Sequence, residues 1–530
     1  MKNYFALDSL GIVSPRNQLL SREDERALAK LHEVTAFQEG RYQVGLLWKY
    51  DDVRLPNNRS MALRRHHCLI KRMEREPQLS VIVRAKMEDY VSKGYIRLLT
   101  PEESRATGNR TWYLPIFPVF NPNKPGKVRI VFDAAASFGG VSLNSVLMKG
   151  PDQLNALPLV LYKFRERQIG LGGDVAEMFH QMRMNPDDAD SQRILWCRNA
   201  DTMEPSDYVM QVVTFGATCS PSTALYVLKE NASRFEKLYP VAVDAIFHRH
   251  YVDDMLTSVN TEEEAIKLAN EVRHIHHQGG FHMGNWVSNS PVVLEALGGN
   301  PKSEKSLEMN AELAMEKVLG MWWSTTTDVF RYKLCTDRNK EILSGAKHPT
   351  KREVLRTLMA IYDPLGLIAH YLMYLKVLLQ EIWRTKVGWD DKIEQHLLEK
   401  WLIWLRILPE LESVEIPRCY LRHGAGIDKA IVELHTFVDA SESGFAAVSY
   451  FRFELDGHIE CSLIGSKTRV APIKFVSIPR LELQAAVVGS RLAQSIAKGH
   501  SIEIHAVSSG QMREMSCVGC SLTIAVIPNS

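Results

Sequence analysis

The stretch HRHYVDDMLTSV, His248–Val259, places two adjacent aspartates in a segment that otherwise favours β-structure. Neighbouring carboxylates repel each other, and Asp is disfavoured in strands. A divalent cation such as Mg²⁺ at a hairpin tip would explain Asp253 and Asp254, because hard cations prefer carboxylate oxygens. The alternative, which this stretch alone would favour, is an ordinary solvent-exposed turn.

A third carboxylate lies upstream, in IGLGGDVAEMFHQM, Ile169–Met182. The glycines before Asp174 mark the end of a strand, and the residues after it suit a helix. Carboxylates on neighbouring strands can hold two metal ions ~3.5–4 Å apart. One ion activates the attacking oxygen and the other stabilises the leaving oxygen, which is the arrangement of polymerases and nucleases.

The segments around these carboxylates predict a compact α+β unit. Residues 112–133 predict two strands around a turn, and residues 243–259 predict strand structure leading through the aspartate pair. Thr261 and Glu264 form a capping box for the helix that follows. The middle of the chain is therefore expected to run strand, helix, helix, hairpin, helix.

The C-terminal part predicts two further regions. Residues 350–383 and 396–411 predict a helical block, and an α/β segment follows. The helix of that segment repeats apolar residues on one face: Leu481, Ala485, Val488, Leu492 and Ile496. The most apolar run, Leu365–Trp383, is interrupted by a histidine and a lysine, so it predicts a buried helix rather than a membrane span.

The chain has 530 residues, too many for one hydrophobic core, so roughly three or four domains are expected. Its 45% hydrophobic and 24% charged residues are typical of a soluble globular protein. Because the formal net charge is only +2, a nucleic acid would have to bind a local basic surface. The segment Arg59–Arg75 is a candidate, with a solvated helix face as the alternative. Eight widely spread cysteines favour a reduced intracellular environment.

YVDDM, Tyr251–Met255, resembles the YxDD motif of reverse transcriptases, and GGDVAEMFHQM resembles the upstream metal-binding segment of that family. TFGATCSPSTALYVL, Thr214–Leu228, resembles the nucleotide-positioning loop and helix. The finer resemblance is to polymerase polyproteins of Pao/BEL-type LTR retrotransposons, and it covers nearly the whole chain up to Gly510. It rests also on GRYQVGLLWK, KMEDYVSKGYIR, VRIVFDAAA, SLNSVLMKGPDQL, VLGMWW and IYDPLGLIAHYLMYLKVLLQEIW, in family order.

The resemblance implies an RNA-directed DNA polymerase that transfers nucleotides from deoxynucleoside triphosphates to a primer 3′-OH with two Mg²⁺ ions, which Mn²⁺ could replace. Asp174 and Asp253 would be the principal metal ligands, Asp254 would complete the cluster, and the Val175 carbonyl would face a metal. The implied partners are an RNA template, a DNA primer and the RNA–DNA hybrid, without a membrane. The implied location is a cytoplasmic virus-like particle, with the nucleus as the alternative.

The resemblance also assigns the nucleotide and primer contacts. Arg129 would bind the incoming triphosphate, which suits a guanidinium group. Phe179 would be the gate that collides with a ribose 2′-OH, and Gly216 would let the backbone approach the nucleotide closely. The hairpin that grips the primer would be formed by Gly320, Met321 and Trp322.

Two positions depart from the family pattern. Phe215 stands where retroviral enzymes have Gln, so the polar contacts at that position are lost or replaced. Asn285 stands where this group usually has a Lys that is thought to protonate the leaving pyrophosphate. Asn cannot act as a general acid at neutral pH, and this change predicts reduced activity.

HTFVDASESGFAAVSYF and SIPRLELQAAVVGSRLAQSI resemble the opening strands and a helix of RNase H. Asp439 and Glu482 would be metal ligands for hydrolysis of RNA in a hybrid, and surface carboxylates are the alternative. A third carboxylate is expected near SIEIHAVSSGQ, where Ser509 is the counterpart. The resemblance therefore implies a truncated, inactive RNase H-like domain.

The expected fold class is α+β: a right-hand reverse transcriptase fold followed by a truncated RNase H-like α/β domain. The expected divisions are residues 1–40 as an N-terminal extension, 41–300 as fingers and palm, 301–430 as thumb and connection, and 431–530 as the RNase H-like domain. One alternative is an impaired nucleic-acid-binding remnant. Another is an aspartic peptidase, because the region after the palm is often labelled peptidase family A17, but the chain has no DTG or DSG loop.

Overall fold

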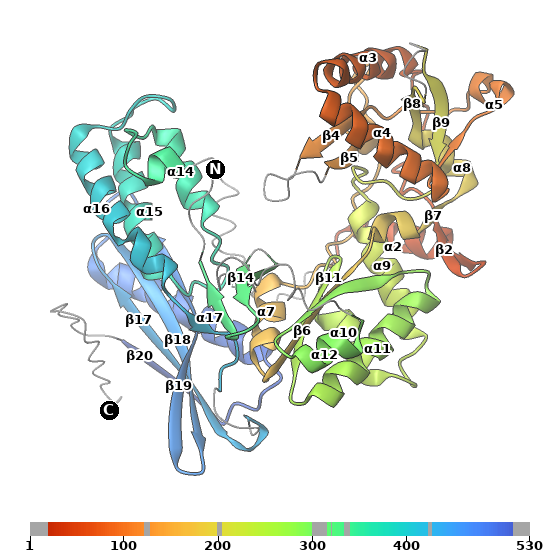
Figure 1. Ribbon diagram of the computed structural model, residues 1–530. Helices are drawn as coiled ribbons and strands as arrows, with labels where there is room; N and C mark the ends of the chain where they lie inside the picture. The colour runs from red at the N-terminus through yellow and green to blue at the C-terminus, as the bar shows by residue number, and fades with distance from the viewer. Residues whose placement is uncertain are drawn as a thin grey trace.

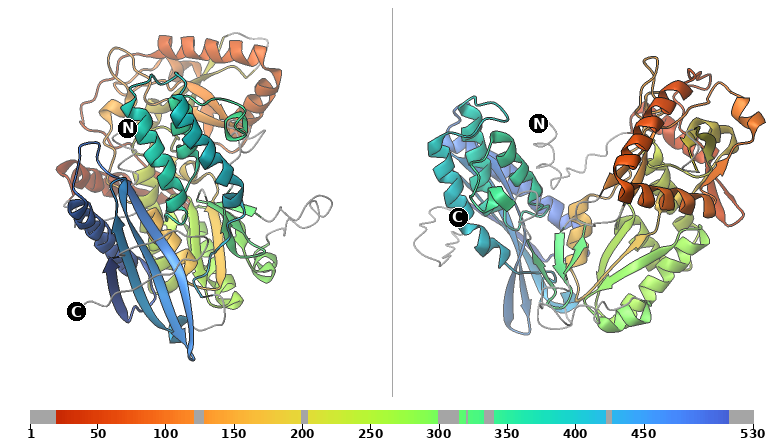
Figure 2. Two further views of the ribbon diagram at one scale, coloured as in Figure 1. Left: turned by 90° about the vertical axis from the view of Figure 1, so that its left-hand side faces the viewer. Right: turned by 45° about the horizontal axis from the view of Figure 1, so that its top comes forward.

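The structure is a computed structural model that describes residues 20–120, 128–198, 204–298, 315–319, 321–332, 340–421 and 427–511. Figure 1 shows two groups of elements that stand apart at their upper ends and meet lower down. The right-hand view of Figure 2 shows the same division from another direction.

Most of the N-terminal elements share one hydrophobic core with the strands β7–β9 defined below. They are α2 (Arg22–Val34), β1 (Ala36–Gln38), β2 (Arg41–Val44), α3 (Arg59–Arg75), α4 (Pro77–Ser92), β3 (Ile96–Leu98), α5 (Pro101–Arg105), β4 (Ile116–Phe120), β5 (Val128–Phe132) and α6 (Leu143–Val146). The strand pair predicted within residues 112–133 is present as β4–β5, and its turn lies outside the described residues. The hairpin β1–β2 spans the expected boundary at residue 40, and α2 packs into this core through Ala27 and Leu31.

The middle elements include a four-stranded sheet of order β10-β11-β6-β12. They are α7 (Leu157–Arg165), β6 (Ile169–Val175), η1 (Met178–Gln181), β7 (Arg183–Met184), α8 (Pro186–Ala189), η2 (Asp190–Gln192), β8 (Arg193–Trp196), β9 (Ser206–Met210), α9 (Ser220–Ser233), α10 (Pro240–His248), β10 (His250–Tyr251), β11 (Asp254–Val259), α11 (Glu262–Gln278), β12 (Met283–Ser288) and α12 (Pro291–Ala296). Residues of α10, α11 and α12 pack against Leu171 and Met255 of the sheet. The capping box of Thr261 and Glu264 is present at the start of α11, as predicted.

The prediction of strand for all of residues 243–259 is wrong, because residues 240–248 form α10. Pro240 stands in the first turn, where its missing N–H costs no hydrogen bond. Ala242, Val243, Ala245 and Ile246 are buried at helical spacing against the sheet and α11. Packing therefore outweighs the strand propensity of Val and Ile, and the strand begins only at His250.

The C-terminal elements form two further four-stranded sheets and a block of helices, and the sheets have the orders β13-β14-β15-β16 and β19-β18-β17-β20. They are β13 (Met315–Val318), β14 (Met321–Ser324), β15 (Val329–Arg331), α13 (Lys340–Leu343), α14 (Lys351–Ala360), α15 (Ala369–Arg384), α16 (Gln395–Glu412), β16 (Ile416–Pro417), η3 (Ile427–Lys429), β17 (Ile431–Ala440), β18 (Gly444–Leu455), β19 (His458–Val470), α17 (Ile478–Gly499) and β20 (Ala506–Gln511). The strand β20 runs parallel to β17, and α17 packs on β17 and β18.

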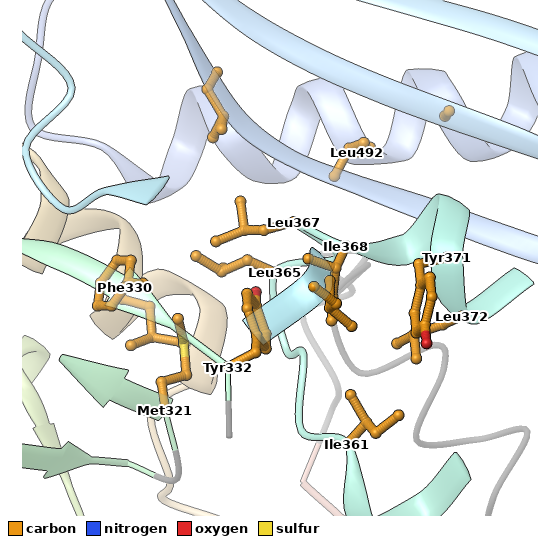
Figure 3. Packing of buried hydrophobic residues seen from close by; sticks show 14 of the residues in the cluster. Met321, Phe330, Tyr332, Ile361, Leu365, Leu367, Ile368, Tyr371, Leu372 and Leu492 are labelled. Carbon is orange, nitrogen blue, oxygen red and sulfur yellow. The ribbon is translucent and has the colours of Figure 1, made fainter. Parts of the chain in front are cut away.

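One hydrophobic core joins these C-terminal elements to α7. Figure 3 shows Phe330 and Tyr332 near the segment of Ile361–Leu372 and Leu492 of α17. The five apolar residues predicted on one face of α17 are all buried in this core. The apolar run of Leu365–Trp383 contributes the buried helix α15, as predicted. Among the helices that the structure describes, none combines the length and apolarity needed to cross a bilayer.

Two buried arginines fasten α7 to the C-terminal elements. Arg165 donates to the carbonyls of Pro417, Arg418 and Ile464 at 3.0–3.2 Å, and its guanidinium group lies 4.4 Å from the Tyr420 ring centre. Arg418 forms a bidentate ion pair with Asp328 at 2.6 and 2.7 Å and also donates to the carbonyls of three residues that lie in or just after α7. Since a buried cation is costly without such partners, both groups depend on the whole assembly.

Candidate functional site

The sheet β10-β11-β6-β12 brings the three predicted carboxylates to one end. β11 pairs antiparallel with β6 so that Asp254 lies opposite Asp174. Val252 and Asp253 form the two-residue turn between β10 and β11, and Val252 has a φ of +61°. The Val175 N–H donates to the Asp253 carbonyl at 2.8 Å, which ties this turn to the end of β6.

The electrostatics of this cluster favour a bound cation. Burial raises the pKa of Asp253, and the neighbouring Asp174 charge raises it further. The Arg129 guanidinium acts in the opposite direction and lowers the pKa of Asp253. Directly opposed like charges on neighbouring strands are also unfavourable, which applies to Asp174 and Asp254. A divalent ion would relieve both effects, because it is attracted to each carboxylate.

The carboxylates are neighbours, but they are not preassembled around an ion. Among the residues that the structure describes, no three His, Cys, Asp or Glu side chains form a ready metal-binding group. The Asp174 Oδ1 instead accepts a hydrogen bond from the Asn285 Nδ2 at 2.7 Å. Asn285 lies in a β-bulge of β12 with a φ of +49°, a conformation that Asn tolerates better than most residues. The donor atoms therefore fit Mg²⁺ in their chemistry, and Asp174 has a competing partner.

Arg129 lies on the exposed face of β5, opposite Val119 of β4. Its positive charge lowers the pKa of Asp253. An exposed guanidinium group can bind a phosphate. Carboxylates that hold a metal ion could place such a phosphate within its reach.

The predicted gate residue Phe179 lies in η1 and contacts Phe215 edge to face, with ring centres 4.6 Å apart. Both rings are only partly buried. The preceding Glu177 has a φ of +49° and holds the segment in place through Lys86, Lys93 and Tyr95, at 2.9–3.0 Å. This anchor could not be predicted from the sequence, because the partners of Glu177 lie more than 80 positions away in the chain.

Gly216 has a φ of +124°, and a Cβ there would lie 2.0 Å from the Phe132 carbonyl oxygen. Asn144 fixes the same loop by donating to the Gly216 carbonyl at 3.0 Å and accepting from the Thr218 N–H at 2.8 Å. The glycine is therefore required by its close approach to β5. Its predicted approach to a nucleotide stays a prediction.

The predicted primer hairpin is present as β13 and β14, with Val318 paired to Met321. The Met321 side chain is buried in the core of Figure 3 and Trp322 is partly buried. Gly320 lies outside the described residues. A primer at this hairpin would therefore meet the backbone or Trp322 rather than the Met321 side chain.

The second predicted carboxylate set lies on the sheet of β17–β20. Asp439 is exposed near the end of β17, and Glu482 lies in the first turns of α17. Ser509 of β20 is in register with Thr436 of β17, on the strand where a third carboxylate was expected. Two carboxylates therefore lie on the elements predicted for them, and a serine lies on β20, the third element.

The fold can be compared with those of solved structures. The foamy viral protease–reverse transcriptase dRH in complex with double-stranded DNA is similar in fold, with a TM-score of 0.51 and 14% identity, over 96% of this chain and 74% of that chain. The foamy viral protease–reverse transcriptase in complex with RNA/DNA hybrid, and with double-stranded DNA, gives TM-scores of 0.49 at 13% identity, covering 99% and 96% of this chain and 65% and 88% of those chains. The chain therefore has a mixed α/β fold that resembles retroviral reverse transcriptase with an RNase H-like domain.

Residues 350–509 match the family described as the Pao retrotransposon-like RNaseH-like domain. The predicted resemblance to Pao/BEL-type retroelement polyproteins is thereby confirmed. The match begins within the helical block and continues through β20, which agrees with the single core that joins them. No curated protein matches the chain.

Proposed function

We propose that this protein is the RNA-directed DNA polymerase of a Pao/BEL-type LTR retrotransposon. The observation that carries the proposal is the register of β6 and β11, which sets Asp174 opposite Asp254 with Asp253 in the adjoining turn. Residues 41–300 would form fingers and palm and residues 301–430 the thumb and connection. The foamy viral protein of similar fold is in complex with double-stranded DNA, which supports a nucleic acid as partner.

In this mechanism, Asp174, Asp253, Asp254 and the Val175 carbonyl would hold two Mg²⁺ ions, with Mn²⁺ as a substitute. When bound, such ions would supply positive charge for attack by the primer 3′-OH and departure of pyrophosphate. The remaining protein groups bind and select the nucleotide: Arg129 pairs with the triphosphate, and the Phe179 ring, backed by Phe215, excludes a ribose 2′-OH. The template is RNA, the primer is DNA, and synthesis takes place in a cytoplasmic particle or the nucleus.

The RNase H-like domain is inactive in this proposal. Asp439 and Glu482 could share one ion, and Ser509 contributes no charge to a second. The domain instead serves as a partner for α7 and the helical block, as the shared core indicates.

A primer-extension assay with Mg²⁺, an RNA template and deoxynucleoside triphosphates tests the polymerase. Asp253→Asn is expected to reduce extension by at least about a hundredfold, since metal ions contribute several kcal/mol to such reactions. The matched change Asp439→Asn, in the RNase H-like domain, is expected to leave extension unchanged. Equal activity of wild type and Asp253→Asn would refute the assignment of the carboxylates.

The second candidate function is a nucleic-acid-binding remnant without turnover, which is favoured by Asn285 and Ser509. It predicts no extension by the wild type, with template binding that weakens as salt increases. An aspartic peptidase is not favoured, because the matching family model is RNaseH-like and the chain has no DTG or DSG loop.

A further inference from the structure

The helix α3 carries a concentration of positive charge that the proposed metal chemistry does not use. It contains six Lys and Arg residues and one acidic residue, Glu74. The net charge of this one helix is therefore larger than the +2 of the whole chain. Such a helix is suited to a phosphate backbone if several of its cations face solvent together.

Half of these cations attach α3 to its surroundings. Three are held by carboxylates at 2.8–3.1 Å: Arg59 by Asp207, Arg65 by Asp133 and Arg72 by Glu76. Asp133 directly follows β5, and the Arg72 guanidinium group also lies 5.4 Å from the ring centre of Phe120, at the end of β4. The helix is therefore fixed to the hairpin β4–β5 that carries Arg129, and Figure 1 shows α3 above this hairpin.

The other three cations, Arg64, Lys71 and Arg75, form a cationic ridge along α3. All three are exposed, and they are spaced seven and four residues apart, which is two turns and then one turn of a helix. The opposite side of the helix holds most of its buried residues: Ala62, His66, Leu69 and Met73. The ridge is about 16 Å long at 1.5 Å per residue. Over this length a nucleic-acid strand carries about five phosphates at ~3.4 Å per nucleotide.

An aromatic ring lies beside the cationic ridge. Phe120 contacts Arg72, the neighbour of Lys71 in the chain, and 44% of Phe120 is still exposed. Proteins that bind single strands combine cations that follow the backbone with aromatic rings on which bases stack. The bases of a duplex already stack on each other, so an exposed ring next to the cations favours an unpaired strand.

We propose that the cationic ridge and the Phe120 ring bind a single-stranded segment of nucleic acid. Arg64, Lys71 and Arg75 pair with phosphates along the strand, and one base stacks on Phe120. This inference rests on the proposed function for the kind of partner, but the phosphate contacts require neither the carboxylates of β6 and β11 nor a metal ion.

Binding of fluorescently labelled oligothymidylate to the full chain tests the cationic ridge. Fluorescence anisotropy is measured over a series of salt concentrations, without Mg²⁺ and without nucleotides. A triple variant replaces the ridge cations by Gln: Arg64→Gln, Lys71→Gln and Arg75→Gln. We expect its affinity to fall at least about tenfold, and the slope of log affinity against log salt to fall by about 2, since each phosphate contact on a single strand contributes about 0.7.

A matched control removes the same charge from another helix. The triple variant Arg480→Gln, Arg491→Gln and Lys498→Gln loses three exposed cations of α17. We expect neither its affinity nor its salt slope to change. Equal losses in the two triple variants would overturn the proposal, because they would show a response to net charge alone.

Phe120→Leu tests the stacking contact separately from the charges. We expect affinity to fall about fivefold with an unchanged salt slope, because stacking on a ring releases no counterions. Phe475→Leu is the control, since Phe475 is 89% exposed in the segment before α17, and it should bind as wild type does. Equal effects of the two changes would refute the role of Phe120.

Two further results would assign the cationic ridge to a different partner and so overturn the proposal. One is a larger loss of affinity for duplex DNA than for the single strand in the ridge variant. The other is displacement of the labelled strand by polyglutamate as effectively as by unlabelled oligothymidylate, which would indicate an acidic protein. Because the assay contains no Mg²⁺, a chain without primer extension can still confirm the ridge, and failure of the ridge leaves the carboxylate proposal untouched.

Discussion

Asn285 forms a hydrogen bond with the Asp174 carboxylate, which a bound metal ion would also contact. Its amide donates to Asp174 Oδ1 at 2.7 Å from a backbone position with positive φ. The family resemblance predicts that Asn285 stands in place of a Lys, but not what the Asn contacts, because the contact depends on a β-bulge in β12. The aspartates themselves could be predicted because their motifs are local and resemble those of a known family, but the register that sets Asp254 opposite Asp174 joins strands that are distant in the sequence.

Asn285→Gly tests whether the amide and a cation compete for Asp174. Glycine retains the left-handed backbone and removes the amide, so we expect a loss of about 1 kcal/mol in the free energy of unfolding without metal. With saturating Mg²⁺ the difference should disappear, because the cation replaces the amide. Thermal unfolding with and without Mg²⁺ measures this.

Asn285→Ala removes the same amide and also strains the backbone. We expect a further loss of about 1 kcal/mol, which Mg²⁺ does not restore. If the deficit of Asn285→Gly is the same with and without Mg²⁺, the amide and the ion do not share Asp174.

At the scale of elements, short sequence motifs predicted where α11 begins, but they did not predict that residues 240–248 form a helix rather than a strand. The capping box of α11 needs only Thr261 and Glu264, which lie three residues apart, and it is present. The helix α10 was missed because its Val and Ile residues favour strands when they are considered alone. Only the sheet and α11, which bury one face of α10, decide between the two structures.

Gly216→Ala is expected to destabilise the protein by about 3 kcal/mol or more, because the new Cβ would collide with the backbone of β5. Gly140→Ala is the matched control, since Gly140 also has a positive φ, +81°, and no atom lies within 4 Å of its added Cβ. The control should lose only about 1 kcal/mol, from backbone strain. Urea unfolding of both variants gives the comparison, and equal losses would contradict the collision.

At the scale of the whole molecule, sequence patterns predicted the series of regions but not how they share a core. The helical block and the RNase H-like segment appeared as separate domains, because each has its own periodicity. The structure packs both on α7, and the contacts join residues about 300 positions apart, such as Arg165 and Ile464. No pattern within a short stretch of sequence predicts such a contact.

Glu166, directly after α7, makes the stability of the packing between α7 and the C-terminal elements depend on pH. It is 4% exposed, and burial raises its pKa from 4.5 to about 7. Between these values the folded protein holds a proton that the unfolded chain releases, so the free energy of unfolding falls as pH rises through this window. Above pH 7 the loss reaches its full extent, about 3 kcal/mol.

Glu166→Gln removes the titrating group and keeps an oxygen that can accept from the Ser501 N–H, 2.5 Å away. We expect the variant to match wild type near pH 4.5 and to exceed its stability at pH 8. Urea unfolding at both pH values checks this. A variant that is less stable at pH 8 would show that the charged carboxylate is favoured at this position.

The two buried arginines between α7 and the C-terminal elements affect which mutations the protein can tolerate. Arg165 finds one of its acceptors, the Ile464 carbonyl, on the sheet of the RNase H-like domain, and Arg418 anchors α7 beside the strand that carries Asp174. A premature stop codon before residue 464 would leave a buried cation without that acceptor and expose the core around α7. The C-terminal sheet is therefore needed for the stability of α7, whatever activity its own carboxylates have.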